Sequence, residues 1–288
     1  MKKITKIAAS LFAVAALAIV LAACGGGSNT SSNTEASSSG SASTEASAST
    51  STATTSASAT TYRIATDTTF APFEYAEADG TYVGIDIELL AAVAKDQGFE
   101  YELDPLGFDA ALQAVQSGQA DGVIAGMSIT DKRKETFDFS EAYYDSTVCA
   151  AALATGDISS LEDLAGKNVA VKSGTMSQSW AESLADEYGF TMTTFDTSDV
   201  MYQDVIAGNS AACFEDTPVM SYAISTGNVD LKLIAEADSS SEFATPYGFA
   251  VNKGNNAELL QMFNDGLKNI KDNGTYDEIV NKYVQSVG

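Results

Sequence analysis

The stretch Leu164-Ala-Gly-Lys-Asn-Val-Ala-Val-Lys-Ser-Gly-Thr175 contains one complete step of an α/β fold. Gly166 ends a short helix, and the apolar run behind it predicts a strand at 168–172. Ser173-Gly174-Thr175 then leads into a helix whose apolar stripe includes Trp180. A strand that passes through a turn of small residues into a helix is the repeating unit of α/β proteins.

The same alternation extends in both directions and covers residues 62–288. Further strands are expected at 63–66, 99–103, 121–126 and 211–214, and a last helix at 276–284. Asp86 is expected to cap the helix that carries Leu90 and Val93. No fixed-period repeat is present, and the length favours two similar α/β lobes over one large sheet.

The first 61 residues have a different composition. Lys2, Lys3 and Lys6 precede an apolar run that ends in Leu21-Ala-Ala-Cys24, which resembles a bacterial lipoprotein signal. We therefore expect a signal peptide at 1–23 and a lipidated Cys24; an ordinary signal peptide or an uncleaved anchor is the alternative. Residues 24–61 are almost entirely Gly, Ser, Thr, Ala and Asn, which predicts a disordered tether behind the lipidated cysteine.

Composition excludes several classes of function. The chain has no histidine, so it contains neither a Ser-His-Asp triad nor a histidine-ligated metal site. Its three cysteines form no CxxC motif and predict no structural zinc. We expect no cofactor. The net charge of −24 disfavours nucleic acid and anionic membrane surfaces as partners.

Polar and aromatic side chains gather in the loops that follow the expected strands, where open α/β sheets bind ligands. These loops are Asp67–Phe73, Gly126–Arg133, Lys172–Thr175 and Glu215–Asp216. A guanidinium and helix N-termini suit a carboxylate, a carboxylate suits an ammonium, and aromatic rings suit an aliphatic chain. Together these groups match a free amino acid and favour binding over catalysis.

Each of these residues also has a plainer structural interpretation. Asp67 and Asp216 are typical of turns and helix caps, and Arg133 suits a solvated helix position beside Asp131 or Glu135. The run Lys172–Thr175 is not a Walker loop and serves equally as a strand-to-helix turn. Phe70, Phe73 and Phe108 are also compatible with a core.

Several motifs occur in the order found in one known family. They are Ala65-Thr-Asp-Thr-Thr-Phe-Ala-Pro-Phe-Glu74, Gly84-Ile-Asp-Ile-Glu-Leu89, Gly126-Met-Ser-Ile-Thr-Asp-Lys-Arg133, Phe137-Asp-Phe-Ser140, 164–175 and Asn273-Gly-Thr-Tyr276. Together they resemble the polar amino-acid substrate-binding proteins of ABC importers (bacterial extracellular solute-binding family 3), and most of all the glutamine-binding proteins. The resemblance covers essentially all of residues 62–288.

The resemblance implies a role for each residue of a binding site. Ser128, Arg133 and Thr175 would hold the α-carboxylate of an amino acid. Asp216 and the Gly126 carbonyl would hold its α-ammonium. Phe70 and Phe108 would flank the side chain, and Asp67 with Lys172 would address its polar end. Met176 and Glu215 depart from the pattern of glutamine binders.

The family also implies an α/β fold of the type II periplasmic-binding-protein class, a Venus flytrap. Two α/β lobes are joined by two hinge strands in this fold. Lobe 1 would comprise 62–142 plus 248–288, lobe 2 would comprise 148–242, and the hinges would be 143–147 and 243–247. Closure of the lobes would capture a polar amino acid for delivery to an ABC permease and its ATPase. The protein would be a monomer at the cell surface, attached to the outer face of the bacterial cytoplasmic membrane only by its lipidated cysteine.

Some alternatives stay open at this point. Glutamine is the expected ligand, with glutamate, cystine and basic amino acids as competitors. Lys172 disfavours lysine and arginine through like-charge repulsion. A dehydratase of prephenate-like acids, a sensor and an adhesin are the competing functions for the fold. Cys149 and Cys213 would either form a disulfide or stay separate, as two small apolar side chains buried in the core.

Overall fold

The computed structural model describes residues 60–284. The expected signal peptide, the lipidated Cys24 and the tether up to residue 59 lie outside these residues. Within 60–284, none of the helices combines the length and the hydropathy that a membrane span requires.

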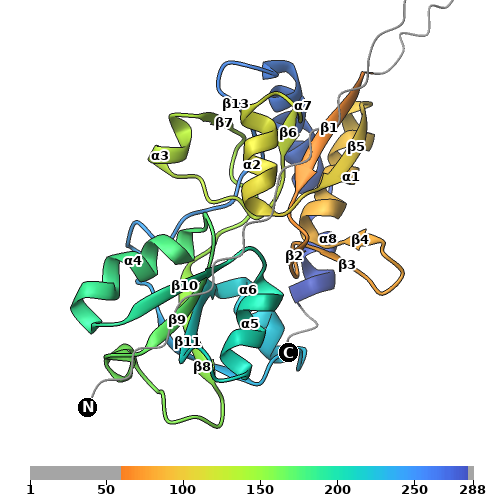
Figure 1. Cartoon of the computed structure of the whole chain (residues 1–288). Coiled ribbons are helices and arrows are strands. Elements are labelled where there is room, and N and C mark those ends of the chain that lie inside the picture. Colours follow the sequence, from red (N-terminus) through yellow and green to blue (C-terminus); the bar gives the residue numbers. More distant parts are fainter. Residues whose placement is uncertain (1–59, 285–288) are drawn as a thin grey trace, which may run out of the picture. The chain divides into compact units, whose positions relative to one another are not determined.

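Lobe 1 is built on a five-stranded sheet in the order β5-β1-β6-β13-β7 (Figure 1). β1 runs parallel to β5 and β6, whereas β13 is antiparallel to both of its neighbours. The strands are β1 (Thr61–Thr66), β5 (Glu100–Pro105), β6 (Gly122–Val123), β7 (Phe137–Phe139) and β13 (Ala250–Asn252). A small antiparallel sheet of β2 (Thr69–Phe70), β3 (Glu74–Ala76) and β4 (Tyr82–Val83) follows β1.

Lobe 2 repeats this arrangement in its own sheet, in the order β10-β9-β11-β8-β12. β9 is parallel to β10 and β11, and β8 is antiparallel to β11 and β12. The strands are β8 (Val148–Leu153), β9 (Asn168–Lys172), β10 (Thr191–Phe195), β11 (Ala212–Asp216) and β12 (Leu231–Glu236). The strand predicted at 168–172 is confirmed as β9.

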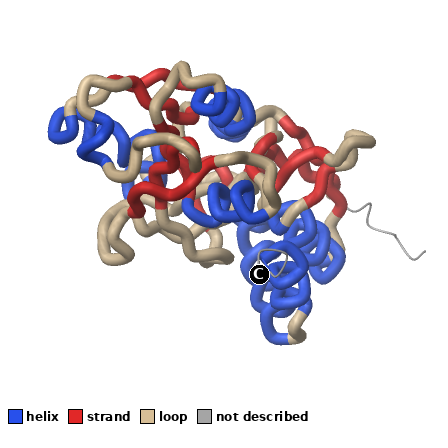
Figure 2. The backbone as a smooth tube through the Cα atoms, turned by 90° about the horizontal axis from the view of Figure 1, so that it is seen from below, coloured by secondary structure: helices blue, strands red, loops and turns tan. Residues whose placement is uncertain are grey.

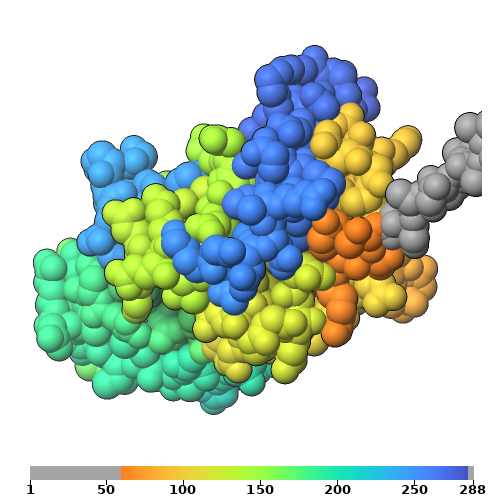
Figure 3. All heavy atoms as spheres, turned by 90° about the horizontal axis from the view of Figure 1, so that it is seen from above, coloured from red at the N-terminus to blue at the C-terminus, as the bar shows by residue number. Residues whose placement is uncertain are grey.

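Helices flank the sheets of both lobes (Figure 2). In lobe 1 they are α1 (Ile85–Gln97), α2 (Phe108–Gln116), α3 (Asp131–Lys134), α7 (Ala257–Asp272) and α8 (Thr275–Val284). In lobe 2 they are the 3₁₀-helix η1 (Leu161–Leu164), α4 (Met176–Tyr188), α5 (Ser198–Ile206) and α6 (Thr217–Ser225). The first strand and the last two helices of the described chain both belong to lobe 1, where α7 and α8 pack against α1 (Figure 3).

Each sheet is buried on both faces, as the continuous apolar strands predict. Ile64 on β1 packs into a core formed with α1, α7 and α8, while its neighbour Ala65 packs on the opposite side with α2. In lobe 2, Val171 belongs to the core under α4, and Ala170 belongs to the core under α5 and α6. The alternation of side chains along a strand explains this division.

Two segments connect the lobes and pair with each other. The amide of Tyr247 donates to the carbonyl of Tyr144 at 2.7 Å, and the amide of Tyr143 donates to the carbonyl of Tyr247 at 2.9 Å. The Tyr247 ring is fully buried and contacts Phe73 edge-on, with 5.0 Å between the ring centroids. The connection therefore has an aromatic core of its own.

Two local expectations are resolved by the structure. Asp86 does not cap a helix, because α1 begins at Ile85 behind Gly84 and the Asp86 side chain turns into the interior of lobe 1. That expectation was wrong. Cys149 and Cys213 are buried free thiols on the neighbouring strands β8 and β11, and burial raises the pKa of both.

Candidate functional site

Residues of both lobes line one small pocket with a free volume of about 10 Å³. Lobe 1 contributes Asp67, Phe70, Phe108, Ala125, Gly126, Ser128 and Arg133, and lobe 2 contributes Lys172, Thr175, Met176 and Asp216. The structure thus brings together all nine residues that the sequence predicted for the site, and adds Ala125 and Met176. Most follow the carboxyl ends of parallel strands, where α/β sheets present ligand-binding loops.

Arg133 lies at the boundary between the two lobes. Its Nη1 donates to the carbonyl of Ser128 at 2.9 Å, and its Nη2 donates to the carbonyl of Gly174 in lobe 2 at 3.0 Å. Its guanidinium also lies 5.3 Å from the centre of the Phe108 ring. Arg133 is therefore fixed by backbone carbonyls and a ring rather than by Asp131 or Glu135, and it keeps further N–H donors for a ligand.

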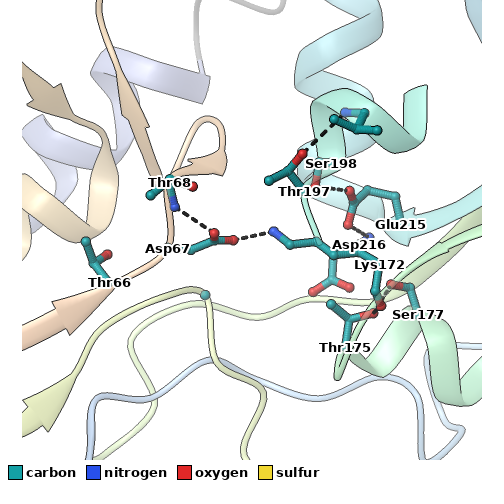
Figure 4. Close-up of polar contacts among 12 residues, drawn as sticks. Thr66, Asp67, Thr68, Lys172, Thr175, Ser177, Thr197, Ser198, Glu215 and Asp216 are labelled. Atoms are coloured by element: carbon teal, nitrogen blue, oxygen red, sulfur yellow. Dashed lines mark hydrogen bonds and ion pairs between the residues drawn. The ribbon is translucent and has the colours of Figure 1, made fainter. Parts of the chain in front are cut away.

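Lys172 crosses from lobe 2 to Asp67 of lobe 1 and forms a buried ion pair with it (Figure 4). Both side chains are about 1% exposed. The ammonium also lies 4.9 Å from the centre of the Phe70 ring. Burial alone would lower the pKa of Lys172, but the charges of Asp67 and Glu215 outweigh it and raise the pKa. Lys172 consequently keeps its charge, and both residues of the pair line the pocket.

Asp216 occupies the N-cap position of α6 without using its side chain as a cap. Its Oδ2 accepts a hydrogen bond of 2.5 Å from the Tyr247 hydroxyl, which itself accepts one from Ser146 at 2.9 Å. Its Oδ1 is buried and has no hydrogen-bond partner among the described residues. Burial and the neighbouring charge of Glu215 raise the pKa of Asp216 to about 7, against the lowering effect of Tyr247 and Arg133. A buried carboxylate oxygen without a partner is costly, so this atom is suited to a donor supplied by a ligand.

Glu215 precedes Asp216 but lies outside the pocket lining. Its carboxyl group accepts hydrogen bonds from Ser198 at 2.8 Å, from Tyr202 at 2.9 Å and from the Asp216 amide at 2.9 Å (Figure 4). Burial raises its pKa, and the charge of Lys172 opposes the rise. Glu215 thus supports the strand end that carries Asp216.

Thr175 uses its hydroxyl inside lobe 2. The hydroxyl donates to the Lys172 carbonyl at 2.8 Å and accepts from the Gln178 amide at 3.1 Å, which makes Thr175 the N-cap of α4. That Thr175 holds a carboxylate stays a prediction, and the backbone N–H groups of the first turn of α4, which have no carbonyl partner within the helix, lie beside it. Thr175 positions those groups.

Gly126 is held by a buried acidic cluster in lobe 1. Its amide donates to Oδ2 of Asp86 at 2.8 Å, and the Tyr143 hydroxyl donates to the same oxygen at 2.7 Å. Its φ of 52° and the Phe70 ring, 2.3 Å from where a Cβ would stand, both require glycine. Glu74 lies beside Asp86, and within 60–284 both of its oxygens lack any other partner.

The two acids of this cluster have shifted ionisation. Burial, followed by the charges of Asp86 and Asp67, raises the pKa of Glu74 well above its usual value. Burial also raises the pKa of Asp86 to about 6, although its bonds from Gly126 and Tyr143 oppose the rise. Two adjacent buried carboxyl groups cannot both ionise cheaply, so Glu74 holds its proton more tightly than an exposed glutamate does.

Sequence reasoning missed Tyr247, the only described side chain that donates a hydrogen bond to the Asp216 carboxylate. The residue lies 31 positions from Asp216 in a segment without helical or strand periodicity, and it reaches the site through the pairing of the two connecting segments. The Pro246-Tyr247 pair carries no local signal for this contact.

Comparison with known proteins identifies the family. Residues 62–286 match the bacterial extracellular solute-binding proteins, family 3. The chain belongs to this family. It is 34% identical over 221 residues to the arginine-binding extracellular protein ArtP of Bacillus subtilis, a match that covers 76% of this chain and 84% of ArtP. The family and the two-lobe α/β fold predicted from the motifs are thereby confirmed.

Solved structures of related proteins agree with this assignment. Substrate binding domain 2 of GlnP from Lactococcus lactis, in an open conformation, is 44% identical, covers 77% of this chain and 94% of its own, and has a TM-score of 0.54. An ancestral arginine-binding protein has been solved bound to arginine and bound to glutamine, with 38% and 37% identity. Both structures cover 77% of this chain and 97% of their own, with a TM-score of 0.70. The chain is a solute-binding protein of the amino-acid ABC transporters.

Proposed function

We propose that this solute-binding protein captures a polar L-amino acid, glutamine foremost, between its two lobes and delivers it to an ABC permease. The observation that carries the proposal is the pairing of opposite charges in one pocket: the Arg133 guanidinium in lobe 1 and a buried, unpartnered oxygen of Asp216 in lobe 2. A free amino acid presents an α-carboxylate and an α-ammonium on one carbon. It therefore bridges the two lobes.

The α-carboxylate binds the free N–H groups of Arg133 and the first amides of α4. Charge-assisted contacts from a guanidinium and from a helix N-terminus both favour an anion. Ser128, whose side chain lines the pocket, adds a hydroxyl. The α-ammonium binds Oδ1 of Asp216 and the carbonyl of Gly126. Because a buried zwitterion is costly unless both ends are paired, both halves of this grip are needed.

The Asp67–Lys172 pair selects the ligand side chain. An amide inserted at this end accepts a hydrogen bond from the Lys172 ammonium and donates one to the Asp67 carboxylate. A guanidinium would have to take Asp67 away from Lys172 and leave a second cation buried beside it. Phe70 and Phe108 flank the aliphatic part. These contacts support glutamine over arginine, although ArtP is named for arginine.

Closure about the segments 143–147 and 243–247 delivers the ligand into this pocket. Lobe 1 is taken as 62–142 plus 248–288, and lobe 2 as 148–242. The ion pair from Lys172 to Asp67 spans the lobes, which supports a closed arrangement here. The comparison of solved structures supports it too. This chain has a TM-score of 0.70 to the ancestral protein bound to arginine and of only 0.54 to the open GlnP domain, although the GlnP domain is more similar in sequence. A ligand that contacts both lobes binds the closed state selectively.

The protein works outside the cell, and we propose that a diacylglyceryl group on Cys24 anchors it as a monomer to the outer face of the cytoplasmic membrane. The basic residues, the apolar run and the Leu-Ala-Ala-Cys sequence at the N-terminus support this anchor. Residues 24–61 then tether the binding lobes near the permease.

A thermal-shift screen against the twenty amino acids tests the proposal. At equal ligand concentration, glutamine should raise the unfolding temperature more than any other amino acid, because a ligand that binds only the folded state stabilises it by RT ln(1 + [L]/Kd), which is largest for the tightest binder. Asp216→Asn should abolish the shift, while the exposed-site variant Asp199→Asn should retain it. A larger shift with arginine, or none with any amino acid, would contradict the assignment.

A further inference from the structure

Asp109 of lobe 1 faces a turn of lobe 2 without taking part in the pocket. It is the second residue of α2, and its Oδ2 accepts a hydrogen bond from the Ser173 hydroxyl. Its Oδ1 lies 2.1 Å from where a Cβ on Gly174 would stand. Both carboxylate oxygens therefore contact the Ser173–Gly174 turn. Asp109 is absent from the pocket lining.

Neither side chain of this contact has another hydrogen bond inside its own lobe among residues 60–284. α2 begins behind Gly107 without a side-chain cap, and Asp109 lies in its first turn, where its carboxylate also suits the helix dipole. The only hydrogen bond found for the Ser173 hydroxyl within 60–284 is the one to Asp109, which lies 64 residues away on the other lobe. Both side chains are half-buried, so water replaces the contact when the lobes separate.

Arg133 approaches the same turn from its other side. Its Nη2 donates to the Gly174 carbonyl, and the charge of Asp109 acts favourably on its guanidinium. Gly174 has a φ of 72° and carries no side chain, which lets both lobe 1 residues reach the backbone of the turn. The Ser173–Gly174 turn is thus held between an anion and a cation of lobe 1.

We propose that Asp109 with the Ser173–Gly174 turn forms a closing latch, which sets the open–closed equilibrium of the ligand-free protein. This inference rests on the proposed function, in which ligand binding is coupled to closure. Apparent affinity scales with the fraction of molecules in the binding-competent state, so the latch tunes affinity and residence time without touching the ligand. A half-exposed hydrogen bond to a charged group is expected to change the closure equilibrium by roughly 3- to 30-fold.

Single-molecule energy transfer on the full-length protein tests the latch. Dyes on noncanonical residues at the exposed positions Gln119 in lobe 1 and Glu187 in lobe 2 report the distance between lobes. Without ligand, Asp109→Ala and Ser173→Ala should each reduce the closed population by roughly 3- to 30-fold in equilibrium constant. The double variant should show no further loss, because each change removes the same interaction. Asp109→Asn keeps an acceptor and should retain part of the closure.

Two further measurements separate the latch from other effects. Asp131→Ala, which removes an exposed acid paired with Lys134 inside lobe 1, should leave the distance distribution unchanged. Glutamine dissociation, followed by stopped flow, should accelerate in the Asp109 and Ser173 variants by the same factor as opening. An unchanged distribution in both variants, or fully additive effects, overturns the latch. If no amino acid binds yet the ligand-free distributions still shift, the latch stands and the proposed ligand fails.

Discussion

The hydroxyl of Tyr247, on a segment that connects the lobes, donates to Oδ2 of Asp216 and leaves Oδ1 of the same carboxylate buried without a partner among residues 60–284. This relationship ties the site to the connection on which closure depends. It also leaves a carboxylate that lines the pocket only partly satisfied. A ligand ammonium that hydrogen-bonds to the second oxygen of Asp216 would therefore stabilise a carboxylate that is bonded directly to a connecting segment.

Glutamine binding should release a proton below about pH 7. Burial and Glu215 raise the pKa of Asp216 to about 7 in the free protein, and an ammonium beside it lowers that pKa again. Affinity should therefore rise as the pH increases towards 7, by at most tenfold per pH unit, and then level off. Calorimetry at pH 6 in buffers of different ionisation enthalpy measures the released proton. A binding enthalpy that does not depend on the buffer would contradict the account.

Lys172→Met should invert the preference between glutamine and arginine. The change removes a donor to the ligand amide and leaves the Asp67 carboxylate buried without a cation, which a guanidinium can then supply. Glutamine affinity should fall by roughly tenfold or more, whereas arginine affinity should rise. Competition titration with both amino acids measures the ratio. The exposed Lys167→Met is the control. An unchanged ratio of glutamine to arginine affinity in Lys172→Met would show that the ion pair does not determine which amino acid binds.

Gly174→Ala should weaken binding without a matching loss of stability. Both Gly174 and Gly189 have a left-handed backbone, with φ of 72° and 70°, so alanine strains each of them by about 1 kcal/mol. Of these two positions, only Gly174 brings the new Cβ against a residue of the other lobe, since no described side chain or backbone atom lies within 4 Å of where a Cβ on Gly189 would stand. Urea unfolding should give similar losses for the two variants. Glutamine affinity should fall at least tenfold in Gly174→Ala alone; equal affinities would show that the turn is not part of closure.

Glu74→Gln should make the stability of lobe 1 less dependent on pH. Burial raises the folded-state pKa of Asp86 to about 6, above its ordinary value, so the folded state binds the proton more tightly than the unfolded state. The free energy of unfolding should then fall as the pH rises from about 4 to about 6, by roughly 2–3 kcal/mol from Asp86, and Glu74 acts in the same direction.

A glutamine at position 74 keeps a neutral donor beside Asp86, as the protonated Glu74 does, and removes the titration of Glu74 itself. Urea unfolding across this pH range should therefore show a flatter profile in Glu74→Gln than in the wild type or in the exposed control Glu77→Gln. A profile as steep as that of the wild type would show that Glu74 does not contribute to the pH dependence of stability.

The sequence predicted the site well where one local rule applied. Lys172 and Asp216 end buried strands of the same parallel arrangement, and the carboxyl ends of such strands converge. The family resemblance then joined these positions to Arg133 and the phenylalanines. Local patterns did not show which of the two N-cap residues uses its side chain to cap its helix, because threonine and aspartate are both favoured at that position. The structure uses the hydroxyl of Thr175 as a cap and leaves the carboxylate of Asp216 for the pocket.

Contacts made across the chain account for what sequence reasoning missed. Asp86 looks like a cap, but the tertiary bonds from Gly126 and Tyr143 draw it into the interior. The contact of Asp109 with Ser173 exists only because the lobes meet. Neither set of contacts produces a pattern in the sequence from which it could be predicted.

Titration calorimetry with glutamine on the wild type, Asp216→Asn and Arg133→Ala tests the central claim most directly. The account predicts a single site in the wild type and a loss of roughly 30- to several-thousand-fold in affinity for each variant, with little change in the unfolding temperature of the ligand-free protein. Wild-type affinity in both variants would contradict the claim that these two residues hold the opposite ends of an amino acid.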